Sequence, residues 1–255
     1  MIRVLLVRHG ETQWNAEGRM QGRTDIPLSE AGLTQSTLAG GLIRGQNPTQ
    51  GHVSTLQRTH QTFEAFELGF APSIWDELCE MGFGEWEGRR GAELRDEQPE
   101  LFTAMRSGQY TPPGGETNEE VTERMRRAFF AAVRATAETT PTPSVDLGFE
   151  VRTTVLVSHG SSLRLLLRSL GLVQPHWWVP LTNASTTFVD IRLHTGPVSS
   201  TLPKAGLGDD LSAEDEAQII RILSDQQIQN SARLRLFNLS PELLNPEEAP
   251  GPTIR

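Results

Sequence analysis

Hydrophobic residues in the first 195 positions form short runs of β-forming residues, separated by segments with helical period. The run Ile2 to Val7 lacks regular polar alternation, which is typical of a strand buried on both faces. Further strands are predicted around His52 to Ser54, at Thr153 to Val157 and, as the last strand, at Thr186 to Leu193.

Helices are predicted between these strands. Ser29 is suited to cap a helix that ends near Gly45, and Gly171 stops another that begins at Ser162. The remaining helices span Thr59 to about Leu68 and Glu119 to about Glu138. Strands that alternate with helices predict an α/β fold, with a mostly parallel central sheet and helices on both faces.

The composition changes after Thr195. Residues 196–208 are rich in Gly, Pro and Ser, which predicts a linker. Ser212 and Asp215 match a capping box, which predicts a helix over about 212–238. We therefore divide the chain into a main domain at 1–195 and an acidic, partly helical extension at 196–255. Three alternatives stay open for the extension: packing on the body, pairing with a second subunit in a homodimer, or partial mobility.

Composition and charge narrow the classes of protein that fit. No apolar run in the 255 residues approaches the roughly 20 positions that a membrane helix needs. The single cysteine, Cys79, suits a reducing compartment and is expected to be a packing residue. With 23 Lys and Arg against 32 Asp and Glu, the net charge of −9 does not favour nucleic acid or a membrane surface as partner. We expect a cytoplasmic protein in which an anionic ligand needs a local cationic pocket.

Two of the predicted strands end in the same way. The first leads into Arg8, His9 and Gly10, and the later one leads into Ser158, His159 and Gly160. Ligands of open parallel sheets collect beyond the carboxyl ends of the strands, so both histidines are expected to face one pocket. The glycines allow a ligand to approach the backbone closely, and the helix after His159 can direct its first amides at an anion.

Two arginines and a carboxylate complete this set. Arg58 follows a short strand and opens a helix, which places it at the same sheet edge as Arg8. Guanidinium groups match phosphate oxygens in two-pronged hydrogen bonds and stay charged at any working pH. Glu80 is the candidate proton donor to a leaving oxygen. Together these groups suit a phosphoryl group.

The motifs resemble those of the histidine phosphatase superfamily, also called the phosphoglycerate-mutase-like family. The resemblance covers Met1 to about Leu193, roughly three quarters of the chain. Its segments, in chain order, are Leu5 to Asn15, Gln21-Gly22, Pro27 to Gly32, Ser54 to Thr62, Glu80 to Gly88, Pro113 to Thr117 and Val157 to Gly160.

The resemblance implies a phosphomonoesterase that acts on a small phosphorylated metabolite without metal or other cofactor. His9 is the implied nucleophile, which forms a phosphohistidine that water then hydrolyses, and Glu80 is the implied general acid and base. The implied clamp on the phosphoryl oxygens consists of Arg8, Arg58 and His159. Because imidazole titrates near neutral pH, a phosphate beside His159 can favour its cationic form. Further substrate contacts are implied for Asn15, Gln21, Gly22 and Gly160.

Two departures from the family pattern affect this expectation. Many relatives have a second glycine where this chain has Ser161-Ser162, so the loop under the phosphate is expected to be tighter or to contribute hydroxyls. Mutases typically carry a longer insert with several basic residues, whereas here the corresponding stretch has Arg89-Arg90 beside the Glu80 motif but only Arg106 shortly before Pro113. We therefore favour phosphatase over mutase activity. A metallophosphatase and a noncatalytic phospho-ligand module remain as alternatives.

The sequence gives the other candidate side chains less specific roles. Surface or packing roles are expected for the four histidines without the strand-His-Gly context: His52, His60, His176 and His194. The pair Trp177-Trp178 suits either a substrate wall or core packing.

Overall fold

The computed structural model describes residues 1–144, 147, 150–174, 180–192 and 213–243. His176, Trp177-Trp178, His194 and the predicted linker at 196–208 lie outside the described residues.

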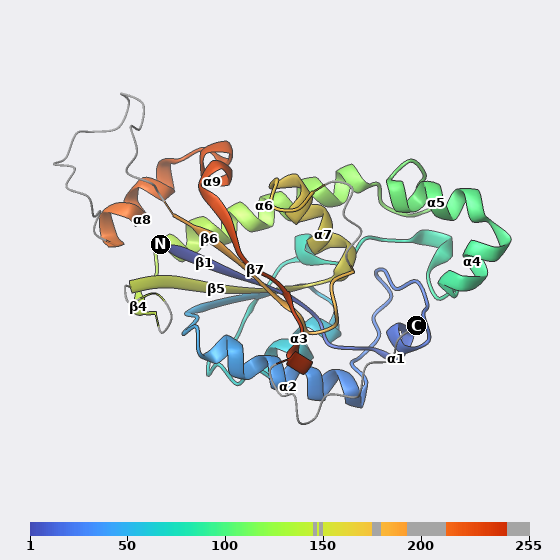
Figure 1. Cartoon of the computed structure of the whole chain (residues 1–255), viewed down its shortest axis with the longest axis horizontal. Coiled ribbons are helices and arrows are strands. Elements are labelled where there is room, and N and C mark those ends of the chain that lie inside the picture. The colour runs from blue at the N-terminus through green and yellow to red at the C-terminus, as the bar shows by residue number, and fades with distance from the viewer. Residues whose placement is uncertain (145–146, 148–149, 175–179, 193–212, 244–255) are drawn as a thin grey trace.

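One central sheet organises the described part of the chain (Figure 1). Its strands lie in the order β3 (Ser73–Ile74), β2 (Gln50–Val53), β5 (Glu150–Ser158), β1 (Ile2–Arg8), β6 (Thr186–Ile191) and β7 (Ala232–Leu239), and β4 (Thr142–Pro143) pairs with β5. The pairs among β1, β2, β3 and β5 are parallel, and β6 and β7 run antiparallel to their neighbours. The predicted α/β class with a mostly parallel sheet is therefore confirmed.

Helices cover both faces of the sheet, as Figure 1 shows. One face carries α2 (Glu30–Arg44) and α3 (Gln57–Glu64), and the other carries α6 (Asn118–Ala137) and α7 (Gly160–Ser169). The remaining helices are α1 (Gln13–Ala16), α4 (Gly91–Glu97), α5 (Pro99–Ser107), α8 (Ala213–Ile222) and α9 (Asp225–Ser231), with short 3-10 turns at Asp76–Leu78, Gly84–Trp86 and Pro241–Leu243.

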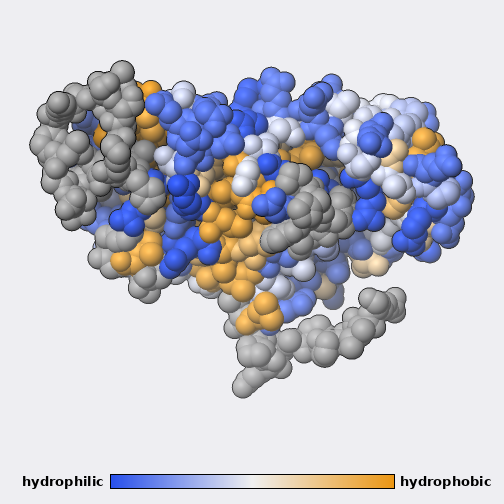
Figure 2. Space-filling view, turned by 45° about the horizontal axis from the view of Figure 1, so that its top comes forward, coloured by the Kyte–Doolittle hydropathy of each residue, from blue (hydrophilic) through white to orange (hydrophobic). Residues whose placement is uncertain are grey.

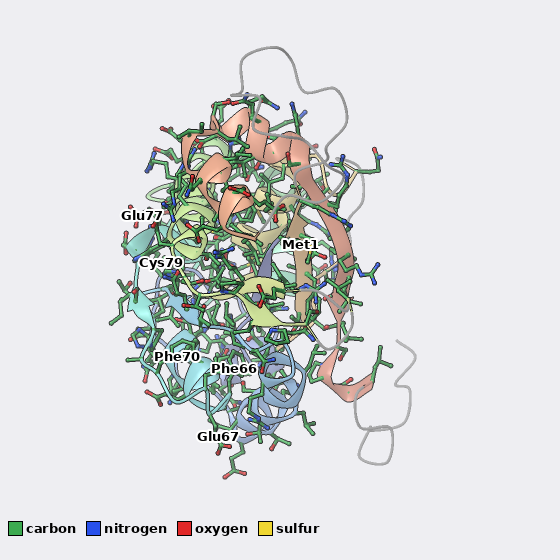
Figure 3. All side chains as sticks on the ribbon, turned by 90° about the vertical axis from the view of Figure 1, so that its left-hand side faces the viewer. Met1, Phe66, Glu67, Phe70, Glu77 and Cys79 are labelled. Carbon is green, nitrogen blue, oxygen red and sulfur yellow. The ribbon has the colours of Figure 1, made fainter. Side chains whose placement is uncertain are left out.

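Strand β1 is buried on both faces, as its sequence predicts. Val4 and Leu6 belong to the core under α6 and α7, whereas Leu5 and Val7 belong to the core under α2 and α3. Figure 3 shows Phe66 in the lower layer of that view, beside α2 and α3. On the face drawn in Figure 2, hydrophobic residues gather in the middle, while the end that carries α4 and α5 is mainly hydrophilic.

Several predicted elements agree with the structure to within a few residues. Ser29 caps α2, because its side chain accepts a hydrogen bond from the Gly32 amide at 3.1 Å. Cys79 is 1% exposed, which confirms its expected packing role. No helix in the described part of the chain is long and apolar enough to cross a membrane.

The predicted helix over 212–238 is wrong from Ala232 onward. The described residues 213–231 form the two helices α8 and α9, divided where Ser224 starts a new capping box with Gln227. Residues 232–239 then form β7, which pairs antiparallel with β6, so Thr186–Ile191 is not the last strand. Alternating charged and apolar residues from Arg233 to Leu236 are a period-2 signal that the helical interpretation overlooked.

His52 of β2 is a buried histidine with an unusual environment. It is 4% exposed and stacks on Trp75 at 4.0 Å between ring centroids, and neither ring nitrogen has a hydrogen-bond partner among the described residues. Burial lowers the pKa of His52 to about 4. The ring is therefore neutral at pH 7, which agrees with the packing role expected from the sequence.

This histidine is expected to make stability depend on pH. Below about pH 6.5 the unfolded chain binds a proton at His52, whereas the folded protein does not until about pH 4, so stability falls as the pH drops through this window. The loss between pH 7 and pH 5 is about 2 kcal/mol from this residue. Urea unfolding at pH 7 and pH 5 should show that the free energy of unfolding falls less in His52→Gln than in the wild-type protein. An equal fall in the two proteins would contradict the assignment.

Candidate active site

The two predicted histidines lie side by side at the carboxyl ends of β1 and β5. These strands pair in parallel with Arg8 opposite Ser158, and the His9 amide donates to the Ser158 carbonyl at 3.0 Å. The rings of His9 and His159 are 5.0 Å apart between centroids and tilted by 59°. The register of two strands therefore brings together residues that are 150 positions apart in sequence.

The proton of the His9 ring has a defined position. Nδ1 lies 2.6 Å from the Gly10 carbonyl oxygen, which only accepts hydrogen bonds. Nδ1 therefore carries the proton, and Nε2 keeps its lone pair. Burial, followed by the charges of Arg58 and Arg8, holds the pKa of His9 well below its usual range. The Nε2 atom is thus available as a nucleophile at neutral pH.

His159 has the opposite tautomer. Arg58 Nε donates to its Nδ1 at 3.2 Å, so the ring proton resides on Nε2, which lies 2.9 Å from the Ser54 hydroxyl. Burial, followed by the charge of Arg58, holds the pKa of His159 well below its usual range. His159 is therefore neutral in this arrangement, and the expectation that it is cationic beside a bound phosphate stays a prediction.

Arg58 is fully buried beneath His159 and outside the cavity lining. Its Nη2 donates to the Gly22 carbonyl at 2.7 Å and its Nη1 donates to the Thr24 carbonyl at 3.0 Å. A side chain at Gly22 would require the backbone to shift, because a Cβ atom would lie 2.8 Å from the Met81 carbonyl oxygen and 2.1 Å from Glu87 Oε1. Arg58 and Gly22 thus hold the loop of residues 21–24 and the His159 ring in place.

Arg8 Nε and Gln21 Nε2 are buried donors that have no hydrogen-bond partner among the described residues, and both side chains belong to residues that line the cavity. Gly160 leaves room for this guanidinium, since a Cβ atom there would lie only 3.3 Å from Arg8 Nε. Buried donors without partners are costly, so the pair is suited to an anion that accepts from both.

Glu80 is held at the N-terminus of α7. Its Oε1 accepts hydrogen bonds from the Met81 amide at 2.9 Å and from the amide and hydroxyl of Ser162, both at 3.0 Å. Its Oε2 accepts from the Ser161 amide at 3.0 Å. The Ser161-Ser162 departure thus supplies a hydroxyl, as expected, but to the carboxylate of Glu80. These four donors fix the carboxyl group at the cavity wall.

Arg124 of α6 is a site residue that the sequence did not reveal. It is 6% exposed and donates to three carbonyls of one short segment: Glu77 at 2.8 Å, Cys79 at 2.7 Å and Glu80 at 3.1 Å. Glu116 pairs with the same guanidinium at 3.0 Å. Figure 3 shows Glu77 and Cys79 close together above Phe66. Arg124 therefore positions the backbone that carries Glu80.

Replacing Arg124 with methionine is expected to destabilise the fold strongly. The apolar chain keeps the volume but leaves three carbonyls and the Glu116 carboxylate without their donor, at a cost of about 3 kcal/mol. Arg127→Met is the matched control on the same helix, because its ion pair with Glu123 is exposed and should contribute less than about 1 kcal/mol. Urea unfolding measures both, and equal effects would exclude this role for Arg124.

A cavity of about 340 Å³ contains the chemistry. Six of the nine predicted site residues line it: Arg8, His9, Asn15, Gln21, Glu80 and Gly160. Gly22, Arg58 and His159 are buried and do not belong to this lining. The lining also includes arginines that the sequence analysis did not assign to the site: Arg19, Arg106, Arg164 and Arg168. The four-residue spacing of Gly160, Arg164 and Arg168 is the signal that would have found two of them.

Comparisons with known proteins agree with this geometry. Residues 4–200 match the family model described as the histidine phosphatase superfamily (branch 1). The curated relatives include a bifunctional protein, Rv2228c, of Mycobacterium tuberculosis, which is 33% identical over 170 residues, or 65% of this chain. The chain spans only 43% of the length of that relative. The probable phosphoglycerate mutase GpmB of Salmonella paratyphi C is 33% identical over 202 residues, or 75% of this chain and 86% of that protein.

Solved structures are similar as well. A structure named mycobacterial hydrolase 1 superposes with a TM-score of 0.71 at 26% identity, over 94% of this chain and 100% of that one. A mycobacterial glucosyl-3-phosphoglycerate phosphatase superposes with a TM-score of 0.64 at 29% identity, over 74% of this chain and 93% of that one.

Proposed function

This chain belongs to branch 1 of the histidine phosphatase superfamily, and from that premise we propose that it hydrolyses phosphomonoesters without a metal. The observation that carries the proposal is the pairing of a nucleophile and a proton donor across one cationic cavity. His9 presents the lone pair of Nε2, and Glu80 is held by four donors in the same lining.

In the first step, His9 Nε2 attacks phosphorus and the bond from phosphorus to the ester oxygen breaks. Glu80 gives its proton to the departing alkoxide. In the second step, Glu80 takes a proton from water, whose oxygen attacks phosphorus, and the bond from phosphorus to nitrogen breaks. Inorganic phosphate leaves, and the His9 lone pair and the Glu80 proton are restored.

The other groups of the cavity stabilise the charge that moves through these steps. Arg8 Nε and Gln21 Nε2 are buried donors that suit the equatorial oxygens of the phosphoryl group. Fixed donors in a water-poor site lower the barrier to phosphoryl transfer without reorganising. Arg58 supports them from beneath by fixing the tautomer of His159.

The names of the relatives favour a small organic phosphate as substrate. One structural relative is named for glucosyl-3-phosphoglycerate, and the curated relative GpmB is named a probable phosphoglycerate mutase. That second name makes mutase activity on the same site the alternative. Hydrolysis is preferred because Pro113 to Glu116 resembles the phosphatase branch.

The test is phosphate release from sugar phosphates, phosphoglycerates and nucleotides, with and without EDTA. We expect release from at least one class that persists in the chelator. Interconversion of 3-phosphoglycerate and 2-phosphoglycerate without net release would instead establish a mutase. Activity that EDTA abolishes and a divalent ion restores would establish a metallophosphatase, and phosphate binding without turnover would establish a binding module.

A further inference from the structure

One residue of the C-terminal extension has a strained backbone. Asn238 of β7 has a φ of 52°, in the left-handed region that residues other than glycine, asparagine and aspartate rarely adopt. Between the pair of Thr186 with Leu239 and the pair of Phe188 with Leu236, β7 uses one residue more than β6, which makes a β-bulge. Bulges turn a side chain in a new direction, and strained residues of this kind cluster at functional sites. The bulge thus gives the Asn238 side chain a direction that regular pairing would not.

The Asn238 side chain bridges both ends of a short loop, residues 180–182. Its Oδ1 accepts hydrogen bonds from the Thr182 amide at 2.8 Å and from the Thr182 hydroxyl at 3.3 Å, and its Nδ2 donates to the Pro180 carbonyl at 3.2 Å. A backbone amide only donates and a carbonyl only accepts, so these contacts fix which way the side-chain amide points. Leu181, between them, is 4% exposed and lines the cavity. Asn238 therefore holds the backbone on both sides of a cavity residue.

The 180–182 loop contacts Arg8 directly. The Leu181 carbonyl accepts a hydrogen bond from Arg8 Nη1. Arg8 Nε has no partner among the described residues, so the loop occupies one donor of this guanidinium and leaves another for a ligand. The same segment continues across the end of β1, where the Ala184 amide donates to the His9 carbonyl at 3.0 Å. The position of the Arg8 side chain thus depends on this loop.

The residue after the loop orients a second predicted phosphate contact, Asn15. Asn183 Nδ2 donates to Asn15 Oδ1 at 3.1 Å, and the Thr12 amide donates to the same oxygen at 3.1 Å. Because both donors occupy Oδ1, the Nδ2 group of Asn15 remains for other contacts. Asn15 lines the cavity, and the NH₂ group is the half of its amide that suits an anion. Arg8 and Asn15 thus both depend on the segment that Asn238 holds.

We propose that Asn238 is a positioning residue for phosphate binding, which acts through residues 180–183 on Arg8 and Asn15. Asn238 does not itself belong to the cavity lining. This inference rests on the proposed phosphatase function, because that function assigns the phosphoryl group to the Arg8 end of the cavity. The match to the family model ends at residue 200, so this support comes from beyond the matched residues. The C-terminal extension therefore contributes to the site as well as to the sheet.

Asn238→Gly tests the contact without adding backbone strain. Glycine adopts a φ of 52° freely, so this change removes the side-chain hydrogen bonds and leaves the backbone conformation accessible. We expect the Kd of inorganic phosphate, measured by calorimetry, to rise about 10-fold, and kcat/KM for p-nitrophenyl phosphate to fall by a similar factor. Asn238→Asp keeps the acceptor for the Thr182 amide and loses the donor to Pro180, so its losses should be smaller.

A control and a second background separate positioning from a general loss of stability. Asn230→Gly is the matched control, because Asn230 is exposed on α9 and lies outside the cavity lining. Glycine there weakens a helix but should leave the Kd of phosphate unchanged. In a double-mutant cycle, Asn238→Gly should lower kcat/KM by only about 3-fold or less when Arg8 is already alanine.

Two results would overturn this role of Asn238. One is an unchanged Kd and kcat/KM in both Asn238 variants. The other is a loss by the same factor with and without the Arg8 side chain, which would indicate a general effect on the fold. Failure of the proposed function looks different, since the wild-type protein would then hydrolyse no ester, while the calorimetric comparison would still report on Asn238.

Discussion

Replacing His9 with alanine is expected to lower kcat by about 10⁴-fold or more and to abolish the phosphoenzyme. The reason is specific to one atom. The Gly10 carbonyl holds the proton on Nδ1, so Nε2 is the only lone pair on this ring that can attack phosphorus. Removing the ring leaves the donors Arg8 and Gln21 but no other histidine within the described lining.

Rapid quenching with a radiolabelled phosphomonoester measures this effect directly. Wild-type protein should retain a label that is stable to base and labile to acid, as a phosphohistidine is, and His9→Ala should retain none. His52→Gln is the matched histidine control, because His52 packs on Trp75 outside the cavity lining. Calorimetric binding of inorganic phosphate to His9→Ala would show that the pocket survives. A label of the same kind on His9→Ala would refute the assignment of the nucleophile.

The histidine pair was predictable because it depends on topology alone. His9 and His159 each follow a buried strand, and parallel strands end at one edge of the sheet. Their protonation states were not predictable. The tautomer of each ring depends on one tertiary contact, with the Gly10 carbonyl for His9 and with Arg58 Nε for His159.

Arginines show the same limit. Arg58 lies within a sequence motif, but the motif does not reveal its contacts. In the structure its three donor groups bind the His159 ring and two backbone carbonyls. Arg124 lies within a long amphipathic helix, where charged residues are common, and no local pattern links it to the Glu80 segment 44 positions away. Side-chain roles that depend on contacts between distant segments are therefore beyond pattern analysis.

Strand β7 was missed for a different reason. Ser212 and Asp215 give a strong helical start signal, which is followed by the apolar residues Ile219, Ile220, Ile222 and Leu223. This helical pattern made a second helix N-cap at Ser224 hard to recognise. It also made the short alternation of charged and apolar residues after α9 hard to recognise. Pairing with β6 determines the strand, and that partner is not visible in the local sequence.

Replacing Glu80 with glutamine is expected to lower kcat/KM for alkyl phosphates by about 10²- to 10⁴-fold. An alkoxide is a poor leaving group and needs a proton as the bond to phosphorus breaks. p-Nitrophenolate leaves without a proton, so kcat/KM for p-nitrophenyl phosphate should fall much less. Glu77→Gln is the control on the same segment, because the Glu77 side chain is exposed and only its carbonyl contacts Arg124.

The contrast between the two esters separates proton donation from positioning. Three backbone amides and the Ser162 hydroxyl all donate to Glu80, so the amide group of a glutamine must oppose at least one donor and shift the side chain. A shift alone would disturb the cavity for both esters and lower their rates equally. Loss of the general acid lowers kcat/KM selectively for the alkyl ester. It also removes the basic limb of the pH profile of that ester, because this limb is set by deprotonation of the general acid. Equal losses with an unchanged profile would restrict Glu80 to a structural role, whereas a selective loss assigns to it the proton that the departing alkoxide requires.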